Sequence, residues 1–516
     1  MSAIITDQLR ILNAKNFVSA ATSSSNSYYA FVGLTNATDY SSGWENNPPA
    51  PKDSFDQEND YWDTMVALKK IKASDVNQVV RKTTWSSGTT YDMYRHDISR
   101  TNTSKPSGAT SLYSADYYVV NSDYRVYICL QNGTDPENPS GRPSLDEPTF
   151  TDLEPKAAGD SGDGYIWKYL YTIKPSEIVK FDTVNFIPVP KNWQTSTENA
   201  AIRNNATSSN NQLKIITITN RGVGLGTANR TYTNVPIKGD GTGGKATIII
   251  NNDSKVESIT VSSGGGGYTY GTVDLVGGNV PTGTTTPTFD VIIPPKGGHG
   301  ADIYRELGAY NVLIYSRIEN DLENPDFITS NKIARVGIVE NPQAYSSTSL
   351  LNVDKASAVY ALRLAGIGYS SATFTVNSRF TQTISTGTTA VGRVVSYDQA
   401  TGVLKYWQDK SLAGFNTDGS QNSSPTYGIN LNRFTSSVGT GGTTFITGTN
   451  LYIDTTFTGI STSINNRTYN LGQSFIEGVA NPEIKKYSGN IVYVDNRPSI
   501  TRSQNQKEDI KVILQF

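Results

Sequence analysis

The sequence is poor in the side chains that most often hold metals or act as nucleophiles. Its 516 residues include one cysteine and two histidines. Cys129 has no second thiol for an intramolecular disulfide and cannot by itself hold a metal cluster. Its alternating surroundings, YRVYICLQN, predict a small buried apolar side chain. His96 and His299 lie far apart in the sequence, and we expect both at the surface or in turns. No cofactor is therefore expected.

Charged residues and long apolar runs are also scarce. Lys and Arg number 44, Asp and Glu number 46, and charged residues make up 17% of the chain. The resulting net charge of -2 argues against a protein that binds nucleic acid by neutralising phosphates. No apolar run approaches the roughly 20 residues that cross a bilayer. We therefore expect neither nucleic acid nor membrane insertion.

Glycine, threonine, serine, asparagine and tyrosine dominate instead. With 45 glycines and 30 tyrosines, the composition is typical of a β-rich protein with many turns. The length allows about three domains of roughly 150 residues. Shifts in glycine and threonine content indicate one base fold interrupted by two β insertions. The expected divisions are base fold at 1–207, a Gly/Thr-rich β-repeat insertion at 208–298, base-fold strands at 299–355, a second β insertion at 356–483 and C-terminal base-fold strands at 484–516.

The run SGDGYIWKYLYTIKP at 161–175 alternates with a period of two. Aromatic and β-branched residues in this pattern predict a core strand, entered from a turn at Asp163-Gly164 and closed by Pro175. An alternative is that Asp160 and Asp163 act as metal ligands or acid–base groups. The run lacks the regular oxygen spacing of a calcium loop, which favours the structural interpretation. One predicted face carries Tyr165, Trp167, Tyr169, Tyr171 and Ile173, and the other carries Ile166, Lys168, Leu170 and Thr172.

Two short stretches in the first glycine-rich region resemble each other. ITITNRGVGL at 216–225 aligns with ITVSSGGGGY at 259–268, an offset of 43 residues. Two copies are too few for a long solenoid, so the pattern predicts a compact β module in which the copies pack together.

The run GDGTGGKA at 239–246 matches two phosphate-binding patterns. Gly239, Gly241 and Gly244 fit G-x-G-x-x-G, and the same run fits G-x-x-x-x-G-K with Ala246 in place of Ser or Thr. Both patterns need a following helix, because the helix N-terminus holds the phosphate. The β-branched run KATIIINN predicts a strand there, so we interpret the glycines as hairpin residues.

Other runs predict further elements. DYWDTMVALKKI at 60–71 has Trp62, Met65, Val66 and Lys69 at helical spacing and predicts an amphipathic helix. NQVVRKTTW, YNVLIYSRI and ARVGIVENP predict strands, as do the segments on either side of the turn at 399–402. The last run, DIKVILQF, predicts a core strand whose buried face carries Ile510, Val512, Leu514 and Phe516.

Three blocks of residues carry a family resemblance. The family pattern G-D-G-Y-x-W-x-Y-L corresponds here to Gly162, Asp163, Gly164, Tyr165, Trp167, Tyr169 and Leu170. Its pattern I-x-x-x-N-P corresponds to Ile338, Asn341 and Pro342, and its C-terminal pattern corresponds to Ser488, Gly489, Tyr493, Asn496, Arg497, Pro498 and Ile500. The N-terminal order is also similar: Trp44, a Pro-Pro pair, Asp53-Ser54, a helix and a strand. Asp495 and Ser499 depart mildly from the pattern. The chain thus resembles the baseplate wedge subunit encoded by gene eight of T-even-like contractile-tailed bacteriophages.

The resemblance implies a mainly β (α+β) fold with an antiparallel β-sandwich core and small α/β parts. It implies a homodimer in the virion tail baseplate, made in the host cytoplasm, which binds neighbouring wedge proteins and takes part in the change that triggers sheath contraction. It implies no enzymatic activity and gives the motif residues a structural role. It covers about 290 residues in three blocks and leaves out the two glycine-rich insertions.

Two other functions remain open from the residues alone. One is a tail-fibre or receptor-binding adhesin whose β modules and tyrosines bind host-surface carbohydrate. The other is a polysaccharide-degrading enzyme, which requires two carboxylates positioned in a groove.

Overall fold

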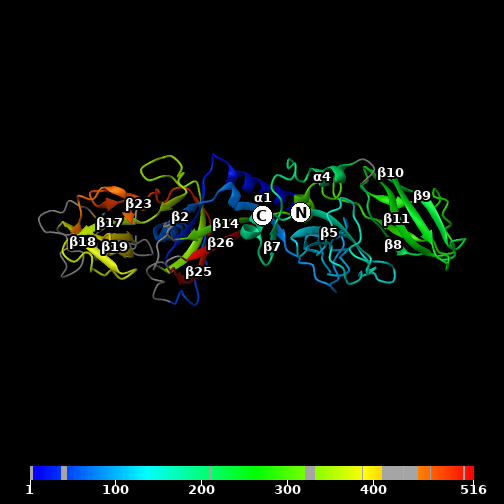
Figure 1. Cartoon of the computed structure of the whole chain (residues 1–516), viewed down its shortest axis with the longest axis horizontal. Coiled ribbons are helices and arrows are strands. Elements are labelled where there is room, and N and C mark those ends of the chain that lie inside the picture. Colours follow the sequence, from blue (N-terminus) through cyan, green and yellow to red (C-terminus); the bar gives the residue numbers. More distant parts are fainter. Residues whose placement is uncertain are drawn as a thin grey trace. The chain divides into compact units, whose positions relative to one another are not determined.

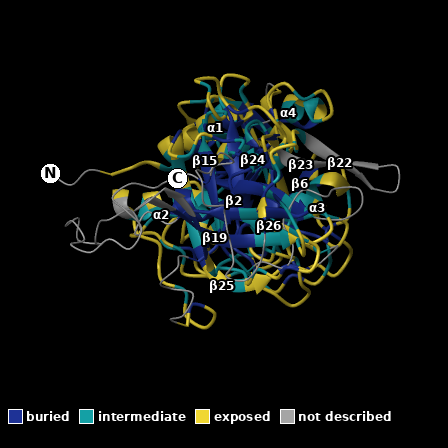
Figure 2. Cartoon of the chain, turned by 90° about the vertical axis from the view of Figure 1, so that its left-hand side faces the viewer, coloured by how far each residue is buried: buried dark blue, intermediate teal, exposed yellow. Residues whose placement is uncertain are grey.

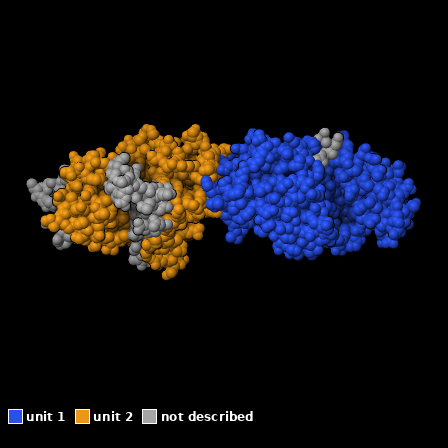
Figure 3. Space-filling model, in the orientation of Figure 1, with its two compact units in different colours: residues 1–18, 77–313, 512–516 blue, residues 19–76, 314–511 orange. Residues whose placement is uncertain are grey.

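The computed structural model describes residues 4–35, 43–208, 212–319, 332–385, 388–408, 434, 451–464, 467–503 and 506–516. The chain divides into two compact units, coloured separately in Figure 3. Unit 1 contains residues 1–18, 77–313 and 512–516, and unit 2 contains residues 19–76 and 314–511. Each unit is therefore built from segments that are far apart in the sequence, and the first 207 residues contribute to both.

Strands make up most of the regular structure, and the ladders with defined registers are antiparallel (Figure 1). This arrangement confirms the mainly β fold class. The helices of the described residues are α1 (Asp7–Thr22), α2 (Phe55–Thr64), α3 (Pro175–Phe181), α4 (Ala200–Thr207) and α5 (Ile303–Leu307), with 3₁₀ turns η2 (Ala73–Asp75) and η3 (Leu112–Ser114).

A three-stranded sheet in unit 1 contains two of the strands predicted from alternation. Its order is β4 (Tyr118–Val120), β5 (Arg125–Asn132) and β6 (Tyr165–Thr172). Tyr165, Trp167 and Tyr171 are buried as predicted, but Lys168 and Leu170 on the other predicted face are buried too. Both faces of β6 are therefore covered. Two register shifts between β5 and β6 further disturb the simple alternation. Cys129 is completely buried in the same core, as predicted.

The first glycine-rich stretch forms two small sheets around a core of its own. One pairs β8 (Ile216–Asn220) with β13 (Thr288–Val291). The other has the order β11 (Val256–Gly266), β10 (Thr242–Ile250), β9 (Arg230–Gly239) and β12 (Gly271–Val273). The two repeat copies supply β8 and β11, and their equivalent residues Leu225 and Tyr268 lie in one apolar cluster. Ile215 and Ile292, at the two ends of the stretch, belong instead to the larger core around Trp167.

A four-stranded sheet holds the last strand of the chain at its edge. Its order is β26 (Lys507–Gln515), β14 (Asn311–Glu319), β3 (Val76–Arg81) and β7 (Phe186–Pro188). Of the predicted buried face of β26 only Val512 is buried, while Ile510, Leu514 and Phe516 are half-buried. The prediction of a core strand was therefore wrong in this respect, because an edge strand has a neighbour on one side only. The chain end is nevertheless held, since Arg10 Nε donates to the Phe516 carbonyl oxygen over 2.7 Å.

A five-stranded sheet lies at the centre of unit 2. Its order is β16 (Lys355–Ser357), β2 (Met65–Lys70), β1 (Tyr28–Gly33), β15 (Lys332–Glu340) and β25 (Asn490–Thr501). The predicted helix over 60–71 was wrong beyond Thr64, because β2 begins at Met65. Residues Met65–Leu68 are all buried between β16 and β1, as the dark blue of β2 shows in Figure 2. A short run that is buried on both faces has no two-residue period, so its pattern can also fit a helix.

The second glycine-rich stretch contributes the largest sheet of unit 2. Its order is β18 (Arg379–Ser385), β19 (Thr388–Asp398), β20 (Val403–Trp407), β17 (Tyr360–Ala365), β24 (Val479–Ala480), β23 (Arg467–Ile476) and β22 (Gly459–Ile464), and β21 (Tyr452–Ile453) pairs with β17. The β19–β20 hairpin confirms the predicted turn at 399–402. Val395 and Trp407 of this hairpin pack in one cluster with Val32 and Val66 of the five-stranded sheet. The stretch therefore shares apolar contacts with β1 and β2.

The thiol of Cys129 should be unreactive in the folded protein. Complete burial raises the pKa of this thiol well above its usual value, so the reactive thiolate is not formed at neutral pH. We expect iodoacetamide to modify the chain only after it is unfolded in guanidinium, as measured by intact mass. Stoichiometric modification of the native protein would contradict the burial of this strand.

The first glycine-rich stretch should be removable if the cut preserves the main core. Thr217 and Asp290 face each other in the β8–β13 ladder, so a short Gly-Ser linker can replace 217–290 and leave Ile215 and Ile292 in place. We expect this variant to remain soluble and to unfold cooperatively in circular dichroism. The wider replacement of 214–293 removes both isoleucines and should be less stable. Aggregation of both variants alike would show that the module is part of the main core.

Candidate functional site

Two of the three motif blocks come together in unit 2. The block at 334–342 lies in β15 and the turn after it, and the block at 488–500 lies in β25 and the turn before it; β15 and β25 pair with each other. The register places Ile338 opposite Tyr493 and Arg335 opposite Asn496. Gly337 lies between Arg335 and Ile338 in β15. A Cβ atom there would lie 2.3 Å from the Phe31 ring, so only glycine leaves room for this ring. Segments about 150 residues apart in the sequence thus form one structural site, which we name the motif junction (residues 334–342 and 488–500).

The turns at one end of the junction are held by hydrogen bonds from backbone N–H groups to side-chain oxygens. Asn341 has the left-handed φ of 52°, and its Oδ1 accepts from Ser27 N over 2.8 Å. Ser488 Oγ accepts from Gln343 N over 2.9 Å, just after Pro342. Gly489 has φ +80°, and a Cβ there would lie 2.3 Å from the Glu340 carbonyl oxygen. The Asn-Pro and Ser-Gly pairs of the motifs are therefore needed by the backbone geometry.

Arg335 supplies the buried charge of the motif junction. Its side chain is 2% exposed. Nε donates to Asn496 Oδ1 over 2.9 Å, and one terminal nitrogen donates to Thr64 Oγ1 over 2.7 Å. The guanidinium also lies over the rings of Tyr61 and Trp44, 4.8 and 5.4 Å from their centroids. One cation thus ties helix α2, strand β25 and the loop around Trp44 to strand β15.

The N-terminal loop is attached to the same strand. Trp44 Nε1 donates to the Arg497 carbonyl oxygen over 2.8 Å, and Asn496 Nδ2 donates to the Pro49 carbonyl oxygen over 2.9 Å. The Arg497 side chain is 66% exposed and pairs with Asp495. Pro498 is exposed and Tyr493 is half-buried. The motif residues therefore divide into a buried set that holds the loop and an exposed set at the end of the strand.

The first motif block lies in unit 1, apart from the other two. Asp163 is buried, and its two oxygens accept from the backbone N–H groups of Leu145 and Tyr165, each over 2.9 Å. Gly164 has φ +85°, and a Cβ there would lie 2.8 Å from Gly133 Cα. Trp167 and Tyr165 stack at 5.3 Å between ring centroids. The Asp-Gly turn therefore fixes the start of β6, whereas Asp160 is exposed.

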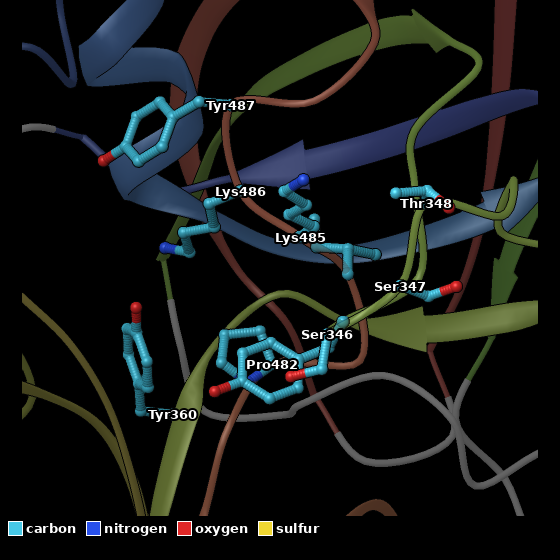
Figure 4. Close-up of a pocket in the computed structure, with 10 residues that line it drawn as sticks. Ser346, Ser347, Thr348, Tyr360, Pro482, Lys485, Lys486 and Tyr487 are labelled. Atoms are coloured by element: carbon cyan, nitrogen blue, oxygen red, sulfur yellow. The ribbon is translucent and has the colours of Figure 1, made fainter.

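A groove of about 720 Å³ borders the motif junction (Figure 4). Its walls come from the segment that follows Asn341-Pro342, from the segment that precedes Ser488-Gly489, and from Tyr360 of β17. Tyr360, Lys486 and Tyr487 lie on one side of the groove, and Ser347 and Thr348 lie on the other. The lining offers phenol rings, hydroxyls and ammonium groups but no carboxylate, through Tyr345, Ser346, Ser347, Thr348, Tyr360, Pro482, Ile484, Lys485, Lys486 and Tyr487.

The glycines of the phosphate-loop pattern lie in the β9–β10 hairpin. Strand β10 begins at Thr242, within the glycine run, and continues through the β-branched residues that predicted a strand. A Cβ at Gly241 would lie 2.5 Å from the Tyr268 ring, and Tyr268 Oη accepts from Gly244 N over 3.0 Å. The tyrosine occupies the space above these glycines. This agrees with their interpretation as hairpin residues.

One histidine lies in a turn, as the prediction allowed, but is buried there. His299 is 3% exposed, and its Nδ1 lies 2.6 Å from Oε1 of the buried Glu306. Glu306 Oε2 also accepts from Gly300 N over 2.6 Å. The adjacent glycines Gly297, Gly298 and Gly300, each with a positive φ, let the chain fold tightly over this pair. No sequence pattern marks Glu306 as its partner. His96 is exposed, as predicted.

The described ranges contain no group of three or more His, Cys, Asp or Glu side chains that could hold a metal ion. Within the same ranges, none of the helices has the length and apolar character needed to cross a membrane.

Replacement of Arg335 should strongly destabilise unit 2. Arg335→Met leaves buried acceptors on Asn496 and Thr64 without their cationic donor, which should lower the free energy of unfolding by roughly 2–4 kcal/mol. Urea denaturation followed by tryptophan fluorescence measures the change. Arg497→Met on the neighbouring exposed position is the matched control, expected within about 0.5 kcal/mol of the unchanged protein. Equal effects of the two substitutions would disprove a special role for the buried guanidinium.

Comparison with known proteins supports the family resemblance over the N-terminal part of the chain. Residues 3–153 match the family model Phage-Gp8, described as Bacteriophage T4, Gp8. No curated protein matches the chain. The matched range contains Trp44, the Pro-Pro pair, Asp53-Ser54 and helix α2, whereas the three motif blocks lie after it. Over residues 3–153 the chain is therefore similar to the Gp8 family of bacteriophage T4, the resemblance that its motifs and N-terminal order indicated.

Proposed function

We propose that this chain is a structural protein of the baseplate wedge in a contractile phage tail. The observation that carries the proposal is the match of residues 3–153 to the Gp8 family. The matched segment includes the Trp44 loop and α2, and both are attached to the motif junction through Arg335 and Asn496. The motif resemblance and the matched range thus support the same assignment from different parts of the chain.

The arrangement of polar groups suits a scaffold. Asp163 binds two backbone amides, Glu306 binds His299 and Gly300, and Arg335 binds Asn496 and Thr64. Each of these buried groups uses its hydrogen-bonding capacity to hold segments together. Buried polar groups that are fully paired fix one arrangement of the chain, because any slip leaves a donor or acceptor unpaired.

For assembly, we propose that the chain acts as a homodimer, binds neighbouring wedge proteins and takes part in the baseplate change that triggers sheath contraction. We also propose that 208–298 is an added module, which is supported by the separate apolar cluster of residues 213–293. Light scattering of the purified chain tests the dimer against the 56.0 kDa of a single chain.

A labelled chain should appear on the baseplate of the phage particle. The β10–β11 hairpin has an exposed turn between Asn252 and Asp253, where a peptide tag should be tolerated. The C-terminus is a poor place for a tag because the Phe516 carbonyl accepts from Arg10. We expect gold-labelled antibody to mark the baseplate in electron micrographs. Label on the distal tail fibres would oppose the wedge proposal and favour the adhesin. Particles assembled with the untagged chain serve as the control.

A further inference from the structure

The side chain of Lys168 is enclosed in the core of unit 1. It lies in β6 opposite Ile128 of β5, and it is 0% exposed. Its Nζ donates to the Leu153 carbonyl oxygen over 2.6 Å and to Asn205 Oδ1 over 3.0 Å. Both acceptors are neutral, so the amine is taken out of water without a carboxylate in hydrogen-bonding contact.

The amide of Asn205 lies between this amine and a carboxylate. Asn205 is carried by α4, whose Ile202 and Ala206 are buried and fix the helix on the core. Its Nδ2 donates to Glu154 Oε1 over 2.6 Å, while Glu154 Oε2 pairs with Lys214 Nζ over 2.7 Å. The order in space is therefore amine, amide and carboxylate, with hydrogen bonds between successive groups.

The surroundings of Lys168 favour the nucleophilic form of its amine. Desolvation by burial is the main cause that lowers its pKa to about 8, and the nearby Lys214 lowers it further. Glu306 and Glu154 act in the opposite direction. A neutral amine is the form that attacks a carbonyl carbon, so a large fraction is competent at mildly alkaline pH. The Asn205 carbonyl carbon is bonded to the oxygen that Nζ contacts, so the amine and the carbon that it would attack are neighbours in the fold.

We propose that Lys168 and Asn205 join in an intramolecular isopeptide bond that the folded chain forms by itself. The lone pair of Lys168 Nζ forms a bond to Asn205 Cγ, and the bond from Cγ to Nδ2 breaks. Once the new bond has formed, Nζ and Nδ2 are attached to the same carbon, and Glu154 Oε1, which lies 2.6 Å from Nδ2, carries the proton from Nζ to Nδ2, which leaves as ammonia. The step needs no oxidant, reductant or cofactor, because an amine and an amide give a new amide and ammonia.

The bond would join two segments that are 37 positions apart in the sequence. It would fasten α4 to the core strand β6 just before the first glycine-rich stretch begins. A covalent link of this kind restricts the unfolded chain and cannot be undone by unfolding or by reducing agents. It would therefore resist a force transmitted through the chain from that stretch.

Mass spectrometry of the purified full-length chain tests the proposal. After incubation at about pH 9, above the amine pKa of about 8, we expect the intact mass under denaturing conditions to be lower than the sequence mass by the mass of ammonia. Trypsin should fail to cleave after Lys168, and the peptide that contains it should be joined to the peptide that contains Asn205. The rate of mass loss should rise with pH through about 8, as the amine loses its proton.

Four variants separate this reaction from other losses of ammonia. Lys168→Met and Asn205→Ala should keep the full mass, whereas Asn204→Ala, at an exposed neighbouring position, should still lose ammonia. Glu154→Gln should slow the loss by roughly 100-fold, the size of a general acid–base contribution. Circular dichroism verifies that each variant is folded. If either Lys168→Met or Asn205→Ala fails to fold, the other one alone shows whether the loss of ammonia requires this pair.

Two results would overturn the proposal. One is a wild-type chain that keeps its full mass after prolonged incubation and is cleaved by trypsin after Lys168. The other is an ammonia loss that persists in Lys168→Met, because a cyclic imide formed by Asn205 with its own backbone releases ammonia without the lysine. An unchanged rate in Glu154→Gln would overturn the role of Glu154 as the catalytic residue.

Discussion

The buried guanidinium of Arg335 is the interaction on which the arrangement of unit 2 depends. A cation that is 2% exposed is costly to desolvate, so it is tolerated only with donors and acceptors placed around it. Thr64 at the end of α2 and Asn496 of β25 provide these acceptors, and the rings of Tyr61 and Trp44 cover the guanidinium. Because these groups come from three separate segments, namely the Trp44 loop, α2 and β25, the charge requires all of them to be in place together.

In unit 1 the buried charged group that must be paired is the carboxylate of Asp163. Asp163 closes the turn before β6 by accepting two backbone amides, and this fixes where the Tyr165 and Trp167 rings enter the core. The opposite face of the strand then brings Lys168 against Asn205 and Leu153. In both units a buried polar residue sets the register of a strand, while the apolar clusters around it supply most of the stabilisation.

This division of roles explains why the motif residues are so varied. Asn341, Gly164 and Gly489 meet backbone requirements, since each has a positive φ. Asp163, Asn496 and Ser488 meet hydrogen-bonding requirements in turns and between strands. Trp167 fills a core. A scaffold that must hold one shape needs all three kinds, because backbone geometry, polar pairing and packing are separate conditions on the same segment.

Much of the fold could be predicted from local pattern. The period of two in YRVYICLQN and YIWKYLYTI predicted β5 and β6, and the burial of Cys129 followed from its place in the first of these runs. Such predictions succeed because alternation and turn chemistry are properties of a few neighbouring residues. The pairing of β15 with β25 could not be derived this way, although a family resemblance pointed to both segments.

The tertiary structure alone decided features that depend on what covers a segment. Residues 65–70 form a strand although their spacing fits a helix, because neighbouring strands on both sides bury Met65–Leu68. β26 is an edge strand although its alternation fits a core strand, because among the described strands it pairs with β14 alone. Lys168 and His299 are buried although their local sequences suggest exposure, because distant segments supply Asn205 and Glu306 as partners. The sequence determined which short segments are strands and turns, since those depend on adjacent side chains. Long-range contact decided burial, partners and strand neighbours, since these depend on residues that the local pattern does not include.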